Sequence, residues 1–415
     1  MREMRESGVE WIGEIPVSWQ ILTIGSVFKV RNEKVNDTDY PPLSVAKGGV
    51  VPQMANVAKS DANDNRKMVL SNDFVINSRS DRKQSCGVSP MDGSVSLINT
   101  VLYPANGAPV IPAYLNYLLK NYGFAEEFYR WGHGIVADLW TTRWQEMKSI
   151  LLPIPSMGEQ QQILEAISEK TDKVDTLIAN VEAQIEKLKA YRQSVITEVV
   201  IKGLDPTVPM KDSGVEWIGE IPAAWDTVRV KQLLRERKER SAEGKEEPLS
   251  MSQKVGLVPT KTLDAIPNPA SSYVGAKLAF VNDLVFNKLK AHLGVFSVSK
   301  YDGLVSPDYA VYYSTGVVDL KYLEYLFKTP QCISEFSKRS TGIAAGLTRL
   351  YTDGLFAIEC PLPPEDEQQA IVSYLDEKWT QIDRLIAIKQ AKIEKLEQYK
   401  RSLIYEYVTG KKEVC

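Results

Sequence analysis

The sequence has 415 residues, 44% of them hydrophobic and 25% charged, with a formal net charge of −3 at pH 7. This length allows two or three domains with cores of their own. No run approaches the roughly 20 apolar residues of a membrane span, and the charged N-terminus lacks the apolar core of a signal peptide. Four scattered cysteines and two histidines argue against a clustered metal site and indicate a reduced, cytoplasmic protein.

An internal repeat dominates the chain. The segment 7–19, SGVEWIGEIPVSW, returns at 213–225 as SGVEWIGEIPAAW, with eleven of thirteen residues identical at an offset of 206. Further matched segments follow in the same order, and they end with PIPSMGEQQ at 153–161 and PLPPEDEQQ at 361–369. Two copies of one unit therefore cover nearly the whole chain.

Each copy begins with a mixed α+β domain, which we expect at residues 1–155 and 206–363. Short runs rich in β-branched and aromatic residues, such as 74–78 and 309–314, are broken by Gly, Pro, Asn and Asp and predict strands joined by turns. Helical patterns at 113–131 and 320–337 are interspersed. The Asn-Asp and Asp-Gly pairs at 72–73, 92–93, 282–283 and 302–303 predict turns.

Each domain is followed by a long helix, expected at 156–205 and 364–410. Ser156 and Glu159 form an S-x-x-E capping box, and the glutamates and glutamines that open each helix suit its N-terminus. Apolar residues then repeat every seven positions, which favours a coiled coil over an amphipathic helix on a globular core. One chain supplies two matching seams, so we predict that the helices pack antiparallel on each other. The seam positions of the first helix are Leu164, Ile167, Thr171, Val174, Ile178, Val181, Ile185, Leu188, Arg192, Val195 and Val199.

The chain lacks the common catalytic motifs. It has no Walker A loop, no Rossmann glycine motif, no H-E-x-x-H, no G-x-S-x-G and no [DNS]-P-P-[YFW] sequence of an amino-methyltransferase. The sequence therefore predicts a binding protein with no cofactor, no metal and no catalytic residue.

The duplicated domain-plus-helix, with P-[IL]-P-x-x-x-E-Q-Q at the start of each helix, resembles the specificity subunit of type I restriction–modification systems. The W-I-G-E-I-P-x-x-W element at 11–19 and 217–225 is similar to the start of that family's target recognition domains. The resemblance implies α+β recognition domains separated by an antiparallel coiled coil, with a pseudo-two-fold repeat. It implies no enzymatic activity, and it implies double-stranded DNA, two methyltransferase subunits and usually restriction–translocase subunits as partners. The target would be bipartite, with its spacing set by the helices.

Residues that differ between matched segments are the candidates for reading DNA. Arginine can bind guanine through two hydrogen bonds and glutamine can bind adenine in the same way, whereas phosphate contacts only set register. A solvated charged surface explains the same residues equally well. The candidates from 78–85 and 288–295 are Arg79, Arg82, Lys83, Gln84, Lys288, Lys290 and His292, and those around the glycine loops are Arg130, His133, Arg143, Lys338, Arg339 and Arg349.

Two other functions remain open at this point. A coiled-coil scaffold would need far less globular chain than the roughly 300 residues expected here. A diverged DNA-modifying enzyme would bind a cofactor such as S-adenosylmethionine. Four tryptophans, Trp11, Trp19, Trp217 and Trp225, are identical in the two copies, so we expect them in the core or at a docking surface for a partner rather than at bases.

Overall fold

The computed structural model describes residues 2–54, 65–79, 83–134, 140–253, 255–263, 272–342 and 348–414. Contacts between residues divide the chain into two compact units. Unit 1 comprises Met1–Glu182 and Gln390–Cys415, and unit 2 comprises Ala183–Lys389. Each unit therefore contains one globular domain, the adjoining part of one long helix and the corresponding part of the other. The division cuts both helices, so the four domain boundaries expected from sequence stay a prediction.

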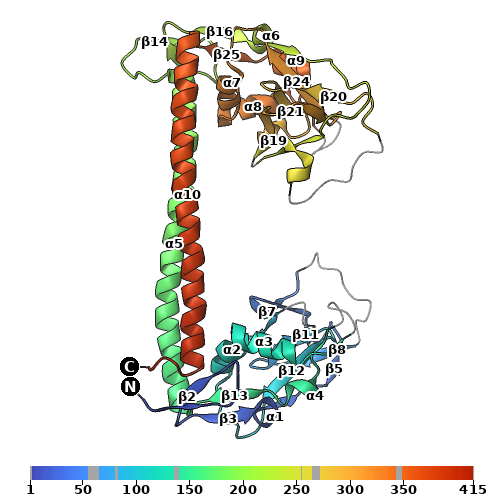
Figure 1. Cartoon of the computed structure of the whole chain (residues 1–415), viewed down its shortest axis with the longest axis vertical. Helices are drawn as coiled ribbons and strands as arrows, with labels where there is room; N and C mark the ends of the chain where they lie inside the picture. The colour runs from blue at the N-terminus through green and yellow to red at the C-terminus, as the bar shows by residue number, and fades with distance from the viewer. Residues whose placement is uncertain are drawn as a thin grey trace. The chain divides into compact units, whose positions relative to one another are not determined.

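The domain of unit 1 mixes short helices with antiparallel strands (Figure 1). Its central sheet has the order β10-β9-β12-β4, and a three-stranded sheet has the order β11-β8-β5. The pairs β1-β2, β3-β13 and β6-β7 complete the strands. The elements are β1 (Met4–Glu6), β2 (Glu14–Pro16), β3 (Gln20–Thr23), α1 (Ile24–Val27), β4 (Phe28–Val30), β5 (Lys34–Val35), β6 (Leu43–Ala46), β7 (Gly49–Pro52), β8 (Arg66–Val69), β9 (Phe74–Asn77), β10 (Cys86–Val88), β11 (Gly93–Val95), β12 (Asn99–Pro104), α2 (Pro112–Lys120), α3 (Tyr122–Arg130), α4 (Trp144–Met147) and β13 (Leu151–Ile154).

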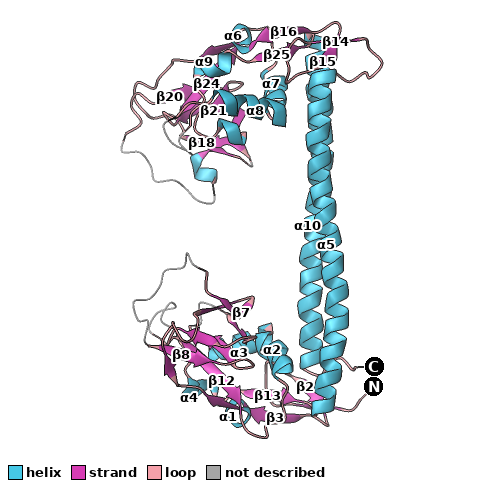
Figure 2. Cartoon of the chain, turned by 180° about the vertical axis from the view of Figure 1, so that it is seen from behind, coloured by secondary structure: helices cyan, strands magenta, loops and turns pink. Residues whose placement is uncertain are grey.

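The domain of unit 2 repeats this arrangement. Its central sheet, β17-β24-β21-β22, matches the four-stranded sheet of unit 1 strand for strand, and the pairs β16-β25 and β14-β15 match β3-β13 and β1-β2 (Figure 2). The elements are β14 (Met210–Asp212), β15 (Glu220–Pro222), β16 (Asp226–Arg229), α6 (Val230–Leu233), β17 (Leu234–Glu236), β18 (Leu249–Ser252), β19 (Gly256–Pro259), η3 (Thr260–Thr262), β20 (Lys277–Ala279), β21 (Leu284–Asn287), η4 (Ala291–Leu293), β22 (Phe296–Val298), β23 (Gly303–Val305), β24 (Tyr309–Ser314), α7 (Leu320–Phe327), α8 (Pro330–Arg339), α9 (Thr352–Phe356) and β25 (Glu359–Leu362).

Both faces of the central sheet are covered. In β9, Phe74 and Ile76 join the main core, whereas Val75 belongs to a smaller cluster with Leu43 and Val101. Unit 2 divides in the same way, with Leu284 and Phe286 on one side and Val285 on the other. These strands are therefore continuously apolar instead of alternating, because side chains on both faces are buried.

The long helices are α5 (Met157–Lys202) and α10 (Glu365–Val408). They lie side by side in both views (Figures 1 and 2). Within unit 2, Arg192 pairs with Asp383 at 2.8 Å and Gln184 bonds Lys389, so residue numbers rise along α5 as they fall along α10. Unit 1 has the equivalent pair, Lys400 with Asp175 at 2.6 Å. The predicted antiparallel packing is thus confirmed, and none of the predicted seam positions in α5 is exposed.

The predicted start of the first helix is also present. The hydroxyl of Ser156 accepts a hydrogen bond from the amide of Glu159 at 3.3 Å. The next residue, Gln160, is fully buried: its amide group donates to the carbonyls of Pro109 and Pro155, and its oxygen accepts from the amide of Ile111. Gln368 repeats these contacts in unit 2. These glutamines therefore fix each helix start to its domain, a role that their helix position alone did not predict.

Each long helix ends at a glycine in a left-handed conformation. Gly203 follows α5 with φ +79°, and a Cβ there would lie 2.8 Å from the carboxylate of Glu367. Gly410 follows α10 with φ +77°, and a Cβ there would lie 2.4 Å from Pro16. Glycine avoids both the backbone strain and the collision. The helix ends can therefore approach the buried tryptophans of the repeated motif, Trp225 in unit 2 and Trp19 in unit 1.

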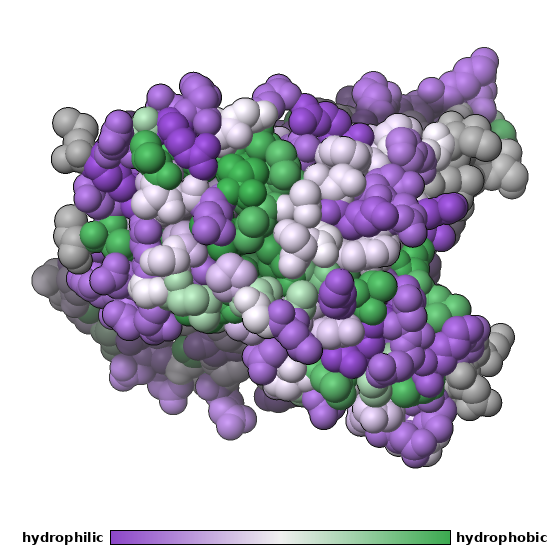
Figure 3. All heavy atoms as spheres, turned by 90° about the horizontal axis from the view of Figure 1, so that it is seen from below, coloured by the Kyte–Doolittle hydropathy of each residue, from purple (hydrophilic) through white to green (hydrophobic). Residues whose placement is uncertain are grey.

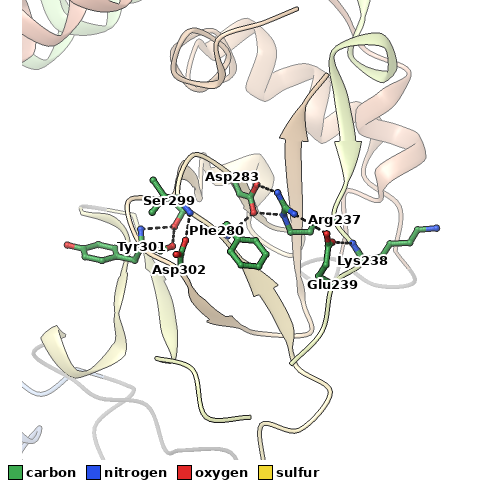
Figure 4. A network of polar contacts seen from close by, with 9 residues as sticks. Arg237, Lys238, Glu239, Phe280, Asp283, Ser299, Tyr301 and Asp302 are labelled. Carbon is green, nitrogen blue, oxygen red and sulfur yellow. Dashed lines mark hydrogen bonds and ion pairs between the residues drawn. The ribbon is translucent and has the colours of Figure 1, made fainter. Parts of the chain in front are cut away.

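A buried ion pair recurs in both units, at the turn before β9 in unit 1 and before β21 in unit 2. In unit 2, Arg237 donates to both oxygens of Asp283, at 2.6 and 2.8 Å, and Asp283 also accepts from the amide of Phe280 (Figure 4). In unit 1, Arg31 makes the same two bonds to Asp73, at 2.7 and 3.1 Å. The hydrogen bond from Arg237 to Asp283 raises the pKa of the guanidinium, which stays charged.

We predict that Arg237→Ala destabilises unit 2 strongly. The substitution leaves the carboxylate of Asp283, only 3% exposed, without its partner. The free energy of unfolding of unit 2 should fall by about 3 kcal/mol, measured by chemical denaturation. The control is Arg229→Ala, which removes a surface pair with Glu359 and should cost less than about 1 kcal/mol. Equal losses in the two variants would contradict the structural role of the buried pair.

Candidate nucleic-acid interface

In unit 1, the structure brings together the segments that sequence comparison singled out. Arg79 pairs with Thr141 in an isolated antiparallel bridge, and the amide of Thr142 donates to the carbonyl of Ser78 at 3.0 Å. His133 and Thr141 exchange two backbone hydrogen bonds of 3.0 Å. The segments around residues 79, 133 and 141 are therefore neighbours, although more than 50 residues separate the first from the second.

Unit 2 repeats this convergence with different side chains. The amide of Leu350 donates to the carbonyl of Lys288 at 3.0 Å. Thr341 and Arg349 exchange hydrogen bonds of 3.0 and 2.8 Å, as His133 and Thr141 do in unit 1. Each unit thus has a surface made of the residues that follow β9 or β21 and of the loop that follows α3 or α8.

Several candidates in unit 1 have definite partners. Lys83 pairs with Glu126 at 2.8 Å, and its ammonium lies 4.4 Å from the ring centre of Tyr129. Gln84 has φ +64° and donates from its side chain to the carbonyl of Lys120 at 3.3 Å.

Arg130 bonds Glu127 and Glu10, and its pKa is raised mainly by the hydrogen bond to Glu10. Arg79, His133 and Arg143 are exposed, whereas Arg82 lies outside the described residues.

The candidates of unit 2 occupy the equivalent surface. Lys290 is exposed immediately before η4, and His292 is half-buried within it. Arg349 pairs with Asp308 at 3.1 Å, and the ammonium of Lys288 donates to the carbonyl of Pro307 at 3.3 Å. Lys338 and Arg339 both bond the carboxylate of Glu335, which is a close parallel to Arg130 and Glu127.

Most of the candidate contact residues are cationic, and many of them are paired with carboxylates. Lys83, Arg130, Lys338, Arg339 and Arg349 each have a carboxylate partner, in keeping with the slightly negative net charge of the chain. Such partners lower the attraction for any phosphate and hold the cations in fixed orientations. The arrangement suits selective contact more than strong general attraction to a polyanion.

Sequence reasoning missed an aromatic part of the unit 1 surface. The rings of Tyr129 and Trp140 stack with centroids 5.8 Å apart, and the Trp140 indole donates to the carbonyl of Tyr129. A Cβ on Gly132 would lie 2.3 Å from the Trp140 indole, so glycine is needed there. The glycine loop was identified by its sequence, but the distance of 11 residues between the rings gave no helical or strand spacing that could predict the stack.

Hydrophobic side chains also reach the surface elsewhere. Figure 3 shows one face of the molecule, where a hydrophobic area is bordered by hydrophilic residues. Exposed large side chains of the chain include Tyr122, 67% exposed, and the helix residues Tyr191 and Tyr399, each 53% exposed. Folded proteins commonly expose some apolar surface, so these side chains alone identify no partner. None of the helices in the described residues has a stretch long and apolar enough to cross a membrane.

Comparison with known proteins supports the family resemblance along the whole chain. No family model matches. A putative type I restriction enzyme specificity subunit of Methanocaldococcus jannaschii, MjaX, is 24% identical over 96% of this chain and 95% of its own length. A second specificity subunit from that organism, MjaVIII, is 25% identical over 64% of this chain and 62% of its own length.

Solved structures show the same fold. A chain from a study of complex assembly and conformational transition of a type I restriction–modification system matches with a TM-score of 0.68 at 16% identity, covering 95% of this chain and 98% of that one. The resemblance to type I specificity subunits is confirmed. The HsdS subunit of Thermoanaerobacter tengcongensis matches with a TM-score of 0.50 at 18% identity, over 98% of this chain and 99% of its own.

The specificity-subunit fold accounts for the duplicated domains and the paired helices. The names of the relatives also agree with the prediction of a specificity subunit. These similarities do not decide which residues contact DNA.

We predict that cysteines replacing Arg79 and Thr141 form a disulfide. The hydrogen bond between Thr142 and Ser78 flanks the bridge between residues 79 and 141. Arg79 and Thr141 therefore form a non-hydrogen-bonded antiparallel pair. Their Cα atoms should lie about 4.5 Å apart, within the range of a disulfide. Oxidation should link residues 79 and 141, as read by mass spectrometry of proteolytic fragments. The pair Arg79→Cys with Arg143→Cys is the control and should stay unlinked; similar yields for both pairs would refute the pairing.

Proposed function

We propose that this chain is the DNA-reading subunit that directs a partner methyltransferase to a bipartite target. Each recognition domain reads one half-site, and adenine methylation is done by the partner. Two methyltransferase subunits and, in a complete system, restriction–translocase subunits assemble with the chain. A subunit that acts on chromosomal DNA works in the cytoplasm.

One observation carries this proposal: the same frame presents different side chains in the two units. The frame consists of the central sheet, the Arg–Asp pairs and a set of backbone hydrogen bonds. These bonds join the loop after α3 or α8 to the residues after β9 or β21. On it, Ser78, Arg79 and His133 of unit 1 correspond to Lys288, Leu289 and Thr341 of unit 2. A constant frame with varied polar side chains is what two readers of different short sequences require.

The proposed contact residues are the exposed and half-buried members of this surface. Those of unit 1 are Arg79, Lys83, Gln84, Arg130, His133 and Arg143, together with Arg82, and those of unit 2 are Lys288, Lys290, His292, Lys338, Arg339 and Arg349. Arginine and lysine can serve as base or phosphate contacts, and each kind of contact has its own experimental signature.

The duplication also supports the proposed number of partners. A chain with two similar units offers two similar surfaces to any protein that binds one of them. The full-length similarity to proteins named as specificity subunits supports a methyltransferase as that protein.

We predict that Arg79→Ala and Lys290→Ala each alter one half of the target. The purified chain, in complex with its methyltransferase, is offered a random DNA pool, and the selected sites are sequenced. Loss of a base contact should cost about 1–3 kcal/mol and relax one position in one half-site. Loss of a phosphate contact should weaken all sequences alike and reduce the salt slope by about one.

Matched control substitutions separate specific from general effects. Lys173→Ala removes an exposed lysine of α5 that pairs with Glu169, and it should change neither half-site. If Arg79→Ala changes both half-sites equally, the two domains do not read independently. If the wild-type complex selects no sequence at all, the proposed function is wrong.

A further inference from the structure

Two buried glutamates occupy the same place in the two units. Glu127 lies near the end of α3 and Glu335 near the end of α8, 208 residues later. They are 7% and 6% exposed, respectively. Carboxylates are seldom buried unless they are paired, so the partners of these two residues are informative.

In unit 1, Glu127 uses one carboxylate oxygen for each of two successive residues. One oxygen pairs with the guanidinium of Arg130 at 2.6 Å. The other accepts a hydrogen bond of 2.7 Å from the indole of Trp131. Both partners reach the surface, because Arg130 is 55% exposed and Trp131 is 36% exposed.

In unit 2, Glu335 does the same for the residues three and four positions ahead. One oxygen accepts from the ammonium of Lys338 at 2.7 Å, and the other pairs with the guanidinium of Arg339. The pKa of Glu335 is lowered: burial acts to raise it, but hydrogen bonds from Lys338 and Arg339 outweigh burial. The glutamate is therefore charged and held by two cations at neutral pH.

The carboxylate is constant while its partners vary. The residue at +3 is Arg130 or Lys338, and the residue at +4 is Trp131 or Arg339. An ordinary surface pair at helix spacing would leave both residues exposed, and it would be worth little. Here the acceptor is buried, and the donors lie at the end of the helix. The loop that follows the helix pairs with Arg79 in unit 1 and with Lys288 in unit 2.

We propose that Glu127 and Glu335 are positioning residues. Each orients the variable side chains three and four positions after it for contact with DNA. The inference rests on the proposed function. Long side chains lose rotamer freedom when they bind a ligand, and a side chain that is already held in its bound orientation loses less. One buried carboxylate can thus support different reading residues without any change of frame.

The test is Glu127→Gln and Glu335→Gln in the full chain complexed with its methyltransferase. Glutamine has nearly the same shape, but its NH₂ group cannot accept a hydrogen bond from arginine, lysine or indole. Site selection from a random DNA pool should show about a tenfold loss of discrimination in one half-site only. Glu127→Gln should affect the half-site read by unit 1, and Glu335→Gln the other. Glu169→Gln, the same change on an exposed face of α5, should affect neither.

A second measurement separates positioning from a purely structural role. If Glu335 acts through Lys338 and Arg339, then Glu335→Gln should change nothing further in a chain that already carries Lys338→Ala and Arg339→Ala. A further loss of selectivity in that background, or a loss in both half-sites at once, would overturn the inference. So would unchanged selection by both glutamine variants when the wild-type complex selects its target. Absence of selection by the wild-type complex would instead reject the proposed function.

Discussion

The end of each long helix is buried in a globular domain, and the rest of the architecture depends on this contact. In unit 1 the hydroxyl of Tyr114 donates to the carbonyl of Val408 at 3.1 Å, and in unit 2 Tyr322 donates to Val200 at 2.9 Å. The last carbonyls of a helix have no partner within it, so burial without such a donor would be costly. Burial raises the pKa of both tyrosines well above its ordinary value, which keeps each hydroxyl protonated as a donor.

This contact makes each domain depend on a segment far away in the sequence. The core of unit 1 includes Leu403, Tyr407 and Val408 from the end of α10, although its own strands come from the first 155 residues. The core of unit 2 includes Val195, Val199 and Val200 from the end of α5. The helices are therefore parts of the domains that they join. This explains why the tryptophan motif is repeated almost without change, since Trp19 and Trp225 lie where the helix ends arrive.

Features with a local period, and the packing of the two matching helices on each other, were predictable from sequence. Individual contacts between distant residues within a domain were not. The heptad identified buried seam residues such as Ile167, Val174 and Val181 because its period is that of one helix face. The Arg237–Asp283 pair joins residues 46 positions apart, and neither residue belongs to a periodic pattern. The variable segments were found because the repeat supplied an internal comparison. That comparison could not say that they converge, which depends on the bonds between loops.

The repeat also shows how exposed side chains can change while the fold of a unit is kept. The positions that differ most lie beyond the ends of the central strands and at the tip of one loop, where side chains contribute little to the main core. Tyr129 and Ser337 occupy equivalent positions, yet both helices keep a buried glutamate two residues earlier. Substitutions at exposed tips usually change stability by less than about 0.5 kcal/mol, whereas loss of the buried acceptor would cost several times more. Exposed side chains at these positions can therefore differ between the two units at little cost in stability.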